Sequence, residues 1–248
     1  MISLSSTVEP TRVRPIVCDW DASSRKPGTG HNAHVWRELL PEVPGLAAAV
    51  VVNRRLGELV PVALTAVVSA ALADGERPLV LGGDHRLSFS VLRAVCGYYD
   101  RPLVHHFDAH HDAHPSPSIS NFSVFDHAAR RLGVPVTRYG CREANPPLPP
   151  SPVGPVSSAY ISIDLDYLDP KLFGGVSFPE PVPDGLVVTP EGLCDNISRI
   201  GDECPVIGAD LVEWRADAEN PTEVAIVIEV LKGLSKVLSA STRVEPAP

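Results

Sequence analysis

The stretch Asp108-Ala109-His110-His111-Asp112 decides how this sequence is interpreted. It follows Pro102-Leu103-Val104-His105-His106-Phe107, a short apolar run with the length of a buried strand. A run that ends abruptly in carboxylates and imidazoles is typical of a parallel strand that carries functional side chains at its carboxyl end. His110 lies two residues from each aspartate, so a turn after the strand can aim all three side chains at one point.

Two further apolar runs end in the same way. Pro78–Leu81 leads into Gly82-Gly83-Asp84-His85, and residues 159–163 lead into Asp164-Leu165-Asp166. Because the carboxyl ends of parallel strands meet at one edge of a sheet, we expect these segments to supply a common metal site. Its six predicted ligands are His85, Asp108, His110, Asp112, Asp164 and Asp166.

The chemistry of this ligand set indicates the kind of metal. Four carboxylates cannot crowd together without compensating positive charge, which a pair of divalent cations would supply. An oxygen-rich set with two imidazoles suits Mn²⁺ better than structural zinc, which prefers thiolates.

The alternation of strand-like and helix-like segments predicts an α/β fold, with three αβα layers around a central, mostly parallel sheet. We expect a single domain over residues 1–248, without internal repeats. In residues 159–166, strand alternation would place Ser162, Asp164 and Asp166 on one face. The predicted strands are 15–19, 47–52, 78–81, 102–107, 135–139, 159–166 and 206–209, and the predicted helices 61–73, 88–95, 126–132, 191–200 and 222–238.

Composition limits the cellular setting. With 248 residues, 44% of them hydrophobic, the chain can bury one large core. The net charge of −9 argues against nucleic acid as a partner. No uninterrupted apolar run has the length of a membrane span, and the first ten residues lack the pattern of a secretion signal. The five cysteines form no C-x-x-C pair. We therefore predict a cytoplasmic protein with reduced thiols, without a membrane partner, and leave a homo-oligomer open.

Four motifs, in order along residues 80–213, resemble those of the arginase/agmatinase (ureohydrolase) family. They are Gly82-Gly83-Asp84-His85, the D-A-H-x-D of 108–112, the S-x-D-x-D-x-x-D-P of 162–170 and the D-x-x-E of 210–213. The resemblance implies the arginase/deacetylase-like architecture and hydrolysis of a guanidino group to an amine plus urea.

The resemblance also implies roles for individual residues. Asp108 and Asp164 would bridge two Mn²⁺ ions. His85 and Asp112 would complete the first shell, and His110 and Asp166 the second. A water activated by these metals would attack the guanidinium carbon, and Asp112 and Asp166 thereby belong to the catalytic set. Glu213 would hold the NH groups of the substrate through charge-assisted hydrogen bonds.

The proton donor to the leaving amine is predicted less directly. The family supplies a histidine in the loop after D-A-H-x-D, and here Phe125-Asp126-His127 resembles the agmatinase-type F-D-H. We take His127 as the candidate, although its spacing from Asp112 needs a small insertion. His114 and His111 are competitors for the role.

The substrate prediction depends on Arg138–Pro146, which resembles the family segment G-x-R-D-x-D-P. Where the family has the aspartate that contacts the α-amino group of free arginine, this chain has Asn145. The loop 113–120 also departs from the residues that bind the α-carboxylate. The candidate substrate-binding residues are His114, Asn121, Asn145 and Glu213.

An amide-bonded arginine has neither a free ammonium nor a free carboxylate, so we predict an arginine side chain within a peptide as the substrate and ornithine as the product. Alternatives are a small guanidino compound (free arginine, agmatine or a guanidino acid), a deacetylase-like amide hydrolase and a non-catalytic metal-binding homologue. The segment Pro146–Pro152 is expected to form a rigid, polyproline-like crossover.

Overall fold

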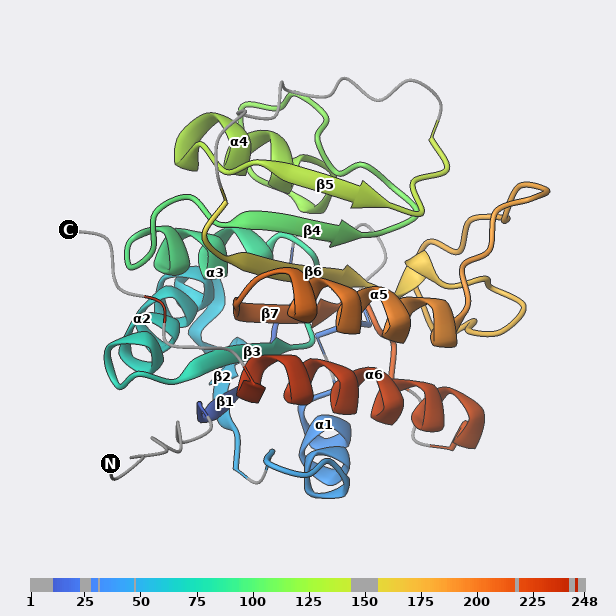
Figure 1. Cartoon of the computed structure of the whole chain (residues 1–248), viewed down its shortest axis with the longest axis horizontal. Helices are drawn as coiled ribbons and strands as arrows, with labels where there is room; N and C mark the ends of the chain where they lie inside the picture. The colour runs from blue at the N-terminus through green and yellow to red at the C-terminus, as the bar shows by residue number, and fades with distance from the viewer. Residues whose placement is uncertain are drawn as a thin grey trace, which may run out of the picture.

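The computed structural model describes residues 11–22, 28–30, 32–46, 48–143, 156–216, 219–240 and 244. Within them, seven strands form one parallel sheet in the order β2-β1-β3-β7-β6-β4-β5 (Figure 1). The predicted α/β class is confirmed. The strands are β1 (Val13–Asp19), β2 (Val50–Asn53), β3 (Arg77–Leu81), β4 (Leu103–Phe107), β5 (Val136–Tyr139), β6 (Ala159–Asp164) and β7 (Val206–Val212).

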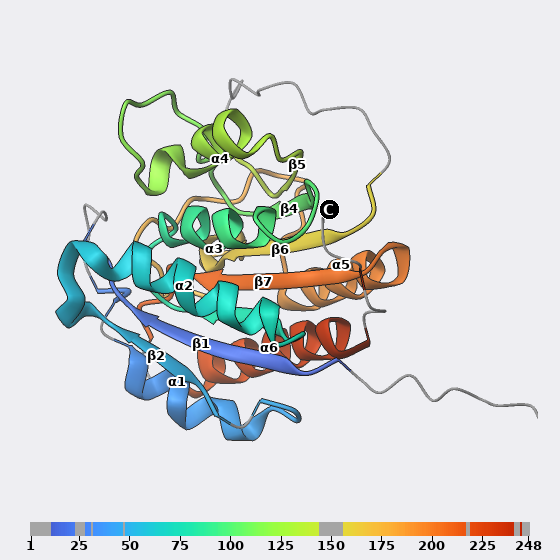
Figure 2. The ribbon, with the colours of Figure 1, turned by 90° about the vertical axis from the view of Figure 1, so that its left-hand side faces the viewer.

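Helices cover both faces of the sheet, which gives the expected three layers (Figures 1 and 2). Ile161 and Ile163 of β6 point into the core on one face, whereas Tyr160 points into the core on the other. The first face carries α1 (Ala33–Leu39), α5 (Pro190–Glu203) and α6 (Pro221–Ala240), and the second α2 (Val60–Ala73), α3 (Leu87–Cys96) and α4 (Val124–Leu132).

The central strands are apolar because they are buried on both faces. Every residue of β3, β6 and β7 is buried, as expected for parallel strands between two helical layers. Strands β3, β7, β6 and β4 are consecutive neighbours in the sheet. Each of them leads at its carboxyl end into one of the four sequence motifs, so the fold brings all four motifs to one edge.

The prediction of a single strand over 159–166 is wrong at its end. Strand β6 stops at Asp164, and a 3-10 turn, η4 (Leu165–Tyr167), follows. The Asp164 carboxylate accepts a hydrogen bond of 2.9 Å from the Asp166 backbone N–H. Asp166 therefore reaches the site through this turn and not through strand alternation.

Other boundaries differ by a few residues. Strand β2 begins at Val50 in place of the predicted residue 47, and α1 was not predicted. Further 3-10 segments are η1 (Leu40–Glu42), η2 (Arg54–Leu59) and η3 (Asn121–Ser123). The segment Pro146–Pro152 lies outside the described residues.

The helical stretch Arg54–Ala73 has the length and mean hydropathy of a membrane span, although Arg54, Arg55 and Glu58 interrupt its apolar run. Gly57 interrupts it with φ 56° and ψ −129°, which separates η2 from the 14-residue α2. Leu64, Val68 and Leu72 of α2 are fully buried against the sheet. The inner face of α2 is thus a core-packing face.

Candidate binuclear metal centre

The turn after β3 places His85 beneath the edge of the sheet. Gly83 has φ +80°, and a Cβ atom there would lie 2.2 Å from Leu87 Cδ1 and 2.6 Å from the Trp20 carbonyl oxygen. Only glycine fits both the conformation and the space. The chain can therefore turn sharply, and His85 becomes fully buried.

The first half of the centre surrounds His85. Its Nδ1 lies 2.9 Å from Asp112 Oδ2, 3.2 Å from Asp108 Oδ2 and 3.5 Å from Asp164 Oδ2. Within the described part of the chain this nitrogen makes no hydrogen bond, despite those short distances. A ring nitrogen and three carboxylate oxygens that converge without a shared proton are the donor set of a metal cation.

The second half surrounds His110. Its Nδ1 lies 2.9 Å from Asp166 Oδ2 and 3.3 Å from Asp108 Oδ1. Asp108 thus presents one oxygen to His85 and the other to His110, and it belongs to both candidate metal-binding groups. This arrangement would allow Asp108 to bridge two cations, the role that the family resemblance implies for it.

The carboxylates of the centre are buried close to one another, and this shifts their pKa values. Burial and then the neighbouring Asp108 raise the pKa of Asp112 to about 7 and that of Asp166 to about 6. Burial, followed by Asp166 and Asp108, raises the pKa of Asp164 well above its ordinary value. Two divalent cations would offset the repulsion between these buried carboxylates, so the residues fit a binuclear metal centre.

Several buried neighbours hold the ligands in place. His106 Nε2 lies 2.8 Å from Asp108 Oδ2, and Ser162 Oγ donates to Asp210 Oδ1 at 2.7 Å. Tyr160 donates to the other oxygen of Asp210 at 2.6 Å. Such outer contacts fix the orientation of metal ligands. His106 and Asp210 are therefore positioning residues.

Glu213 follows β7 and points its carboxylate toward His85. Its backbone adopts φ 62°, a left-handed conformation that is unfavourable for a non-glycine residue. Oε1 accepts a hydrogen bond of 2.9 Å from the His85 backbone N–H, while Oε2 is buried without a partner in the described residues. Burial and then Asp84 raise the pKa of Glu213 well above its usual range. A cationic ligand would satisfy Oε2.

A cavity of about 560 Å³ opens beside His110. His114, Glu143 and Glu180 line it, together with Phe122. The predicted substrate-binding residue His114 thus lies at the mouth of the centre. Sequence reasoning missed both glutamates, although Glu143 stands in the quoted G-x-R motif, where its charge could have been noticed.

The remaining predicted site residues are placed less favourably. His127 is buried on α4 and its ring packs 6.4 Å from that of Phe89. Phe125, two residues earlier, packs against His85. Side chains two residues apart on a helix point in directions that differ by roughly 200°. Because Phe125 faces His85, His127 faces away from the metal ligands. The structure therefore does not bring the expected proton donor to the centre. Asn121 is buried, and its Oδ1 has no hydrogen-bond partner among the described residues. Asn145 lies outside them.

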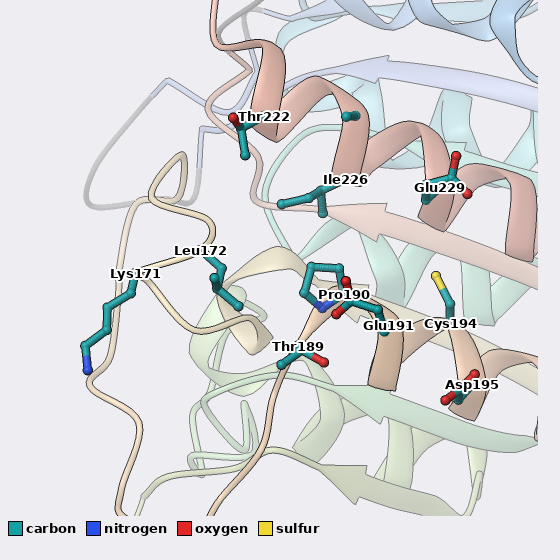
Figure 3. Close-up of a pocket in the computed structure, with 11 residues that line it drawn as sticks. Lys171, Leu172, Thr189, Pro190, Glu191, Cys194, Asp195, Thr222, Ile226 and Glu229 are labelled. Atoms are coloured by element: carbon teal, nitrogen blue, oxygen red, sulfur yellow. The ribbon is translucent and has the colours of Figure 1, made fainter.

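A larger cavity, of about 880 Å³, lies apart from these ligands, between the first turns of α5 and α6 (Figure 3). Its lining is mostly apolar and includes Cys194. Burial and then Glu229 raise the pKa of this thiol, so it is not an activated nucleophile. The chemistry of the molecule is concentrated at the smaller cavity.

Comparison with known proteins identifies the family. The sequence model of the Arginase family matches residues 47–147 and 152–231. The chain belongs to the arginase family. A mitochondrial arginase from Medicago truncatula is 30% identical over 178 residues, 59% of this chain and 51% of that protein. An agmatinase from Halalkalibacterium halodurans is 28% identical over 184 residues, 63% of this chain and 61% of the relative. The chain therefore spans about half to three fifths of these relatives.

The fold is also that of the family. A crystal structure of an arginase from Bacillus subtilis superimposes with a TM-score of 0.75 at 18% identity, and covers 90% of this chain and 98% of that one. In this chain, the His/Asp groups described above lie at the carboxyl edge of that fold's sheet.

Proposed function

We propose that this arginase family chain is a binuclear manganese hydrolase that cleaves a guanidino group to an amine plus urea. The observation that carries the proposal is a shared carboxylate, Asp108, together with a Glu213 oxygen that has no hydrogen-bond partner in the part of the chain that the structure describes. The first supports a pair of cations, and the second supports binding of a planar cation beside them. The oxygen-rich ligand set favours Mn²⁺.

Each residue contributes a defined step. The six ligands would hold the metals, which supply a water of lowered pKa as the nucleophile. Glu213 Oε2 accepts hydrogen bonds from the guanidinium and orients its carbon, while Oε1 remains bound to the His85 backbone N–H. The water oxygen joins that carbon, the bond to the side-chain nitrogen breaks, and the amine leaves with a proton while urea keeps the oxygen.

For the substrate, we propose an arginine side chain within a peptide, which would yield ornithine. The cavity beside His110 supports this, because its lining in the described part of the chain contains no lysine or arginine. The free carboxylate of arginine or of a guanidino acid would lose water there without a cationic partner. Agmatine, which has no carboxylate, is the competing small substrate.

A urea assay tests the reaction class. The protein is incubated with and without Mn²⁺ on free arginine, agmatine, a guanidino acid and an arginine peptide, with mass spectrometry of the peptide. We expect Mn²⁺-dependent urea release and ornithine in the peptide. Release of acetate from acylated amines by a single zinc would favour the deacetylase-like alternative. Metal binding without turnover of any compound would favour a non-catalytic homologue.

For the cellular setting, we propose the cytoplasm. All five cysteines are free, which agrees with a reducing compartment.

A further inference from the structure

We infer that Arg142 is a positioning residue for the second half of the metal centre, because it holds in place the short turn that carries Asp166. The inference rests on the proposed function and deepens it, since it gives a role to a side chain outside the proposed ligand set. Asp166 is the ligand that needs such support, because it lies beyond the end of β6 and is carried by the three-residue η4.

The η4 turn has little support of its own. A single helical turn fixes several backbone dihedrals for very few hydrogen bonds, and its last carbonyls have no partner within the turn. In η4 the Leu168 N–H donates to the Leu165 carbonyl at 3.3 Å, a long hydrogen bond. Tyr167 and Leu168 are buried, so their carbonyls require partners from elsewhere in the chain.

Arg142 provides these partners through its guanidinium. Nη2 donates to the carbonyl oxygen of Tyr167 and, at 3.2 Å, to that of Leu168, while Nη1 donates to the carbonyl oxygen of Glu180. Basic side chains commonly bind the last carbonyls of a helical turn in this way. The planar guanidinium holds three carbonyls in one geometry, which the compact ammonium of a lysine would not reproduce.

The backbone of Arg142 also contacts the other ligand turn. Its N–H donates to the Ala109 carbonyl at 2.8 Å, within the D-A-H-x-D motif. The Ala109 N–H in turn donates to Asp166 Oδ1 at 3.0 Å. Arg142 therefore joins the turn after β4 to the turn after β6, and one carboxylate oxygen of Asp166 is fixed at that junction.

The loop after β5 packs directly against η4. Gly140 has φ +82°, and a Cβ atom there would lie 2.4 Å from Tyr167 Cδ2. Only glycine fits both this backbone conformation and the contact with the Tyr167 ring. The close approach at Gly140 brings Arg142 within reach of the η4 carbonyls.

With Oδ1 fixed, the other oxygen of Asp166 is aimed at the second metal position. Oδ2 lies 2.9 Å from His110 Nδ1, and Asp108, His110 and Asp166 form one of the candidate metal-binding groups. Outer contacts that fix a ligand strengthen metal binding, because less order has to be imposed when the metal arrives. Arg142 thus raises the affinity of this group for its cation.

The first half of the centre is supported by other residues. His85 is held by the Ser162 hydroxyl of β6 and by the Glu213 carboxylate after β7. The described hydrogen bonds of Arg142 reach neither His85 nor Asp112. Loss of the Arg142 guanidinium should therefore weaken the second metal selectively.

Titration of the metal-free protein with Mn²⁺, followed by calorimetry and metal analysis, tests the inference. The wild type should take up two ions per chain. Arg142→Met keeps an apolar stem and removes the donors. We expect this variant to hold the first ion as the wild type does and the second about tenfold or more weakly. Arg142→Lys keeps the charge but not the fork of donors, and its second ion should bind with intermediate affinity.

Arg199→Met is the matched control. The Arg199 guanidinium also donates hydrogen bonds, to Glu203 and Asn196, but on an exposed part of α5. Both ions should bind this variant as they bind the wild type. Wild-type affinity for both ions in Arg142→Met overturns the inference. An equal loss of both ions also overturns it, because that result would mean a general structural role. If Arg142→Met does not fold, Arg142→Lys is judged by the same criteria.

Urea kinetics separate this inference from the proposed function. In Arg142→Met, excess Mn²⁺ should restore kcat to near its wild-type value on the compound that the wild type hydrolyses best, with KM unchanged. A low kcat with both metal positions filled would overturn the inference. Absence of urea from the wild type contradicts the proposed function, while the Mn²⁺ titration still decides the role of Arg142. A wild-type chain that takes up fewer than two ions contradicts both.

Discussion

His85 Nε2 lies 3.1 Å from Ser162 Oγ, so one buried hydrogen bond joins the turn after β3 to strand β6. Because the Ser162 hydroxyl donates to Asp210 at 2.7 Å, it accepts the proton of His85 Nε2. The opposite ring nitrogen, Nδ1, is thereby left with its lone pair toward the carboxylates.

Ser162→Ala removes this anchor. The His85 ring then loses its fixed tautomer and orientation, and we expect Mn²⁺ affinity to fall by about 10- to 100-fold. Metal titration calorimetry measures the change. Ser158→Ala is the matched control, because Ser158 is also buried and its Oγ has no hydrogen-bond partner in the described residues. Equal affinities of the two variants would contradict the role given to Ser162.

Asp108→Ala should lose both metals, since Asp108 contributes an oxygen to each half of the centre. Asp166→Ala removes a carboxylate from the second half alone and should retain one metal. Metal analysis after gel filtration distinguishes these stoichiometries. One tightly held zinc ion per wild-type chain, with activity intact, would sink the binuclear manganese assignment.

Glu213→Gln should keep both metals but lower kcat/KM by about a hundredfold, because one charge-assisted contact to the guanidinium is lost. The amide oxygen can still accept from the His85 backbone N–H, so the local fold is preserved. Steady-state kinetics and metal analysis on the same samples provide both readouts. Near-normal turnover would exclude Glu213 as the anchor of the substrate.

His127→Gln should retain turnover within about threefold, because His127 packs against Phe89 on the side of α4 that faces away from His85. The expected cost is a modest loss of stability from altered packing. Urea kinetics and thermal unfolding separate the two effects. A loss of turnover with metal and substrate binding intact would restore His127 as the proton donor.

His105 should make the fold sensitive to acid. Its Nδ1 lies 3.0 Å from the Tyr139 hydroxyl, and burial lowers the pKa of His105 to about 4. The unfolded chain titrates near pH 6.5 and so binds more protons below that pH. The contribution of His105 to stability is therefore complete above about pH 6.5 and declines as the pH falls toward 4.

His105→Asn should show a shallower loss of stability over this pH range. Both proteins are unfolded by urea without metal, so that protonation of the metal ligands affects them equally. Between about pH 6.5 and pH 4, His105 should account for a loss of no more than about 3 kcal/mol in the free energy of unfolding. Parallel curves for the two proteins would show that His105 does not titrate on unfolding.

Sequence reasoning located the metal centre because its information is local. Each ligand motif follows a buried strand, and parallel strands can deliver side chains only to one edge. The six candidate ligands therefore lie at one edge of the sheet, and Asp166 reaches it through η4. The strand over 159–166 was predicted too long because strand alternation and a tight turn can both place residues i and i+2 on the same side of the chain.

The residues that line the cavity beside His110 could not be predicted from the sequence in the same way. Glu143 and Glu180 come from loops that are far apart in sequence, and only tertiary contacts such as those of Arg142 bring them together. His127 was misplaced because a motif gives no helix phase. Helix α1 was missed because its burial depends on packing of Trp36 against the distant Trp214.

The three strands that lead into the proposed metal ligands, β3, β4 and β6, all lie in the interior of the sheet, and this ties folding to metal supply. Without cations, the buried carboxylates oppose the closure of the very strands that form the core. Each ion that binds only the folded chain adds about 2.7 kcal/mol at a concentration a hundredfold above its Kd. Manganese availability would therefore set how much folded protein persists, as well as how fast it works.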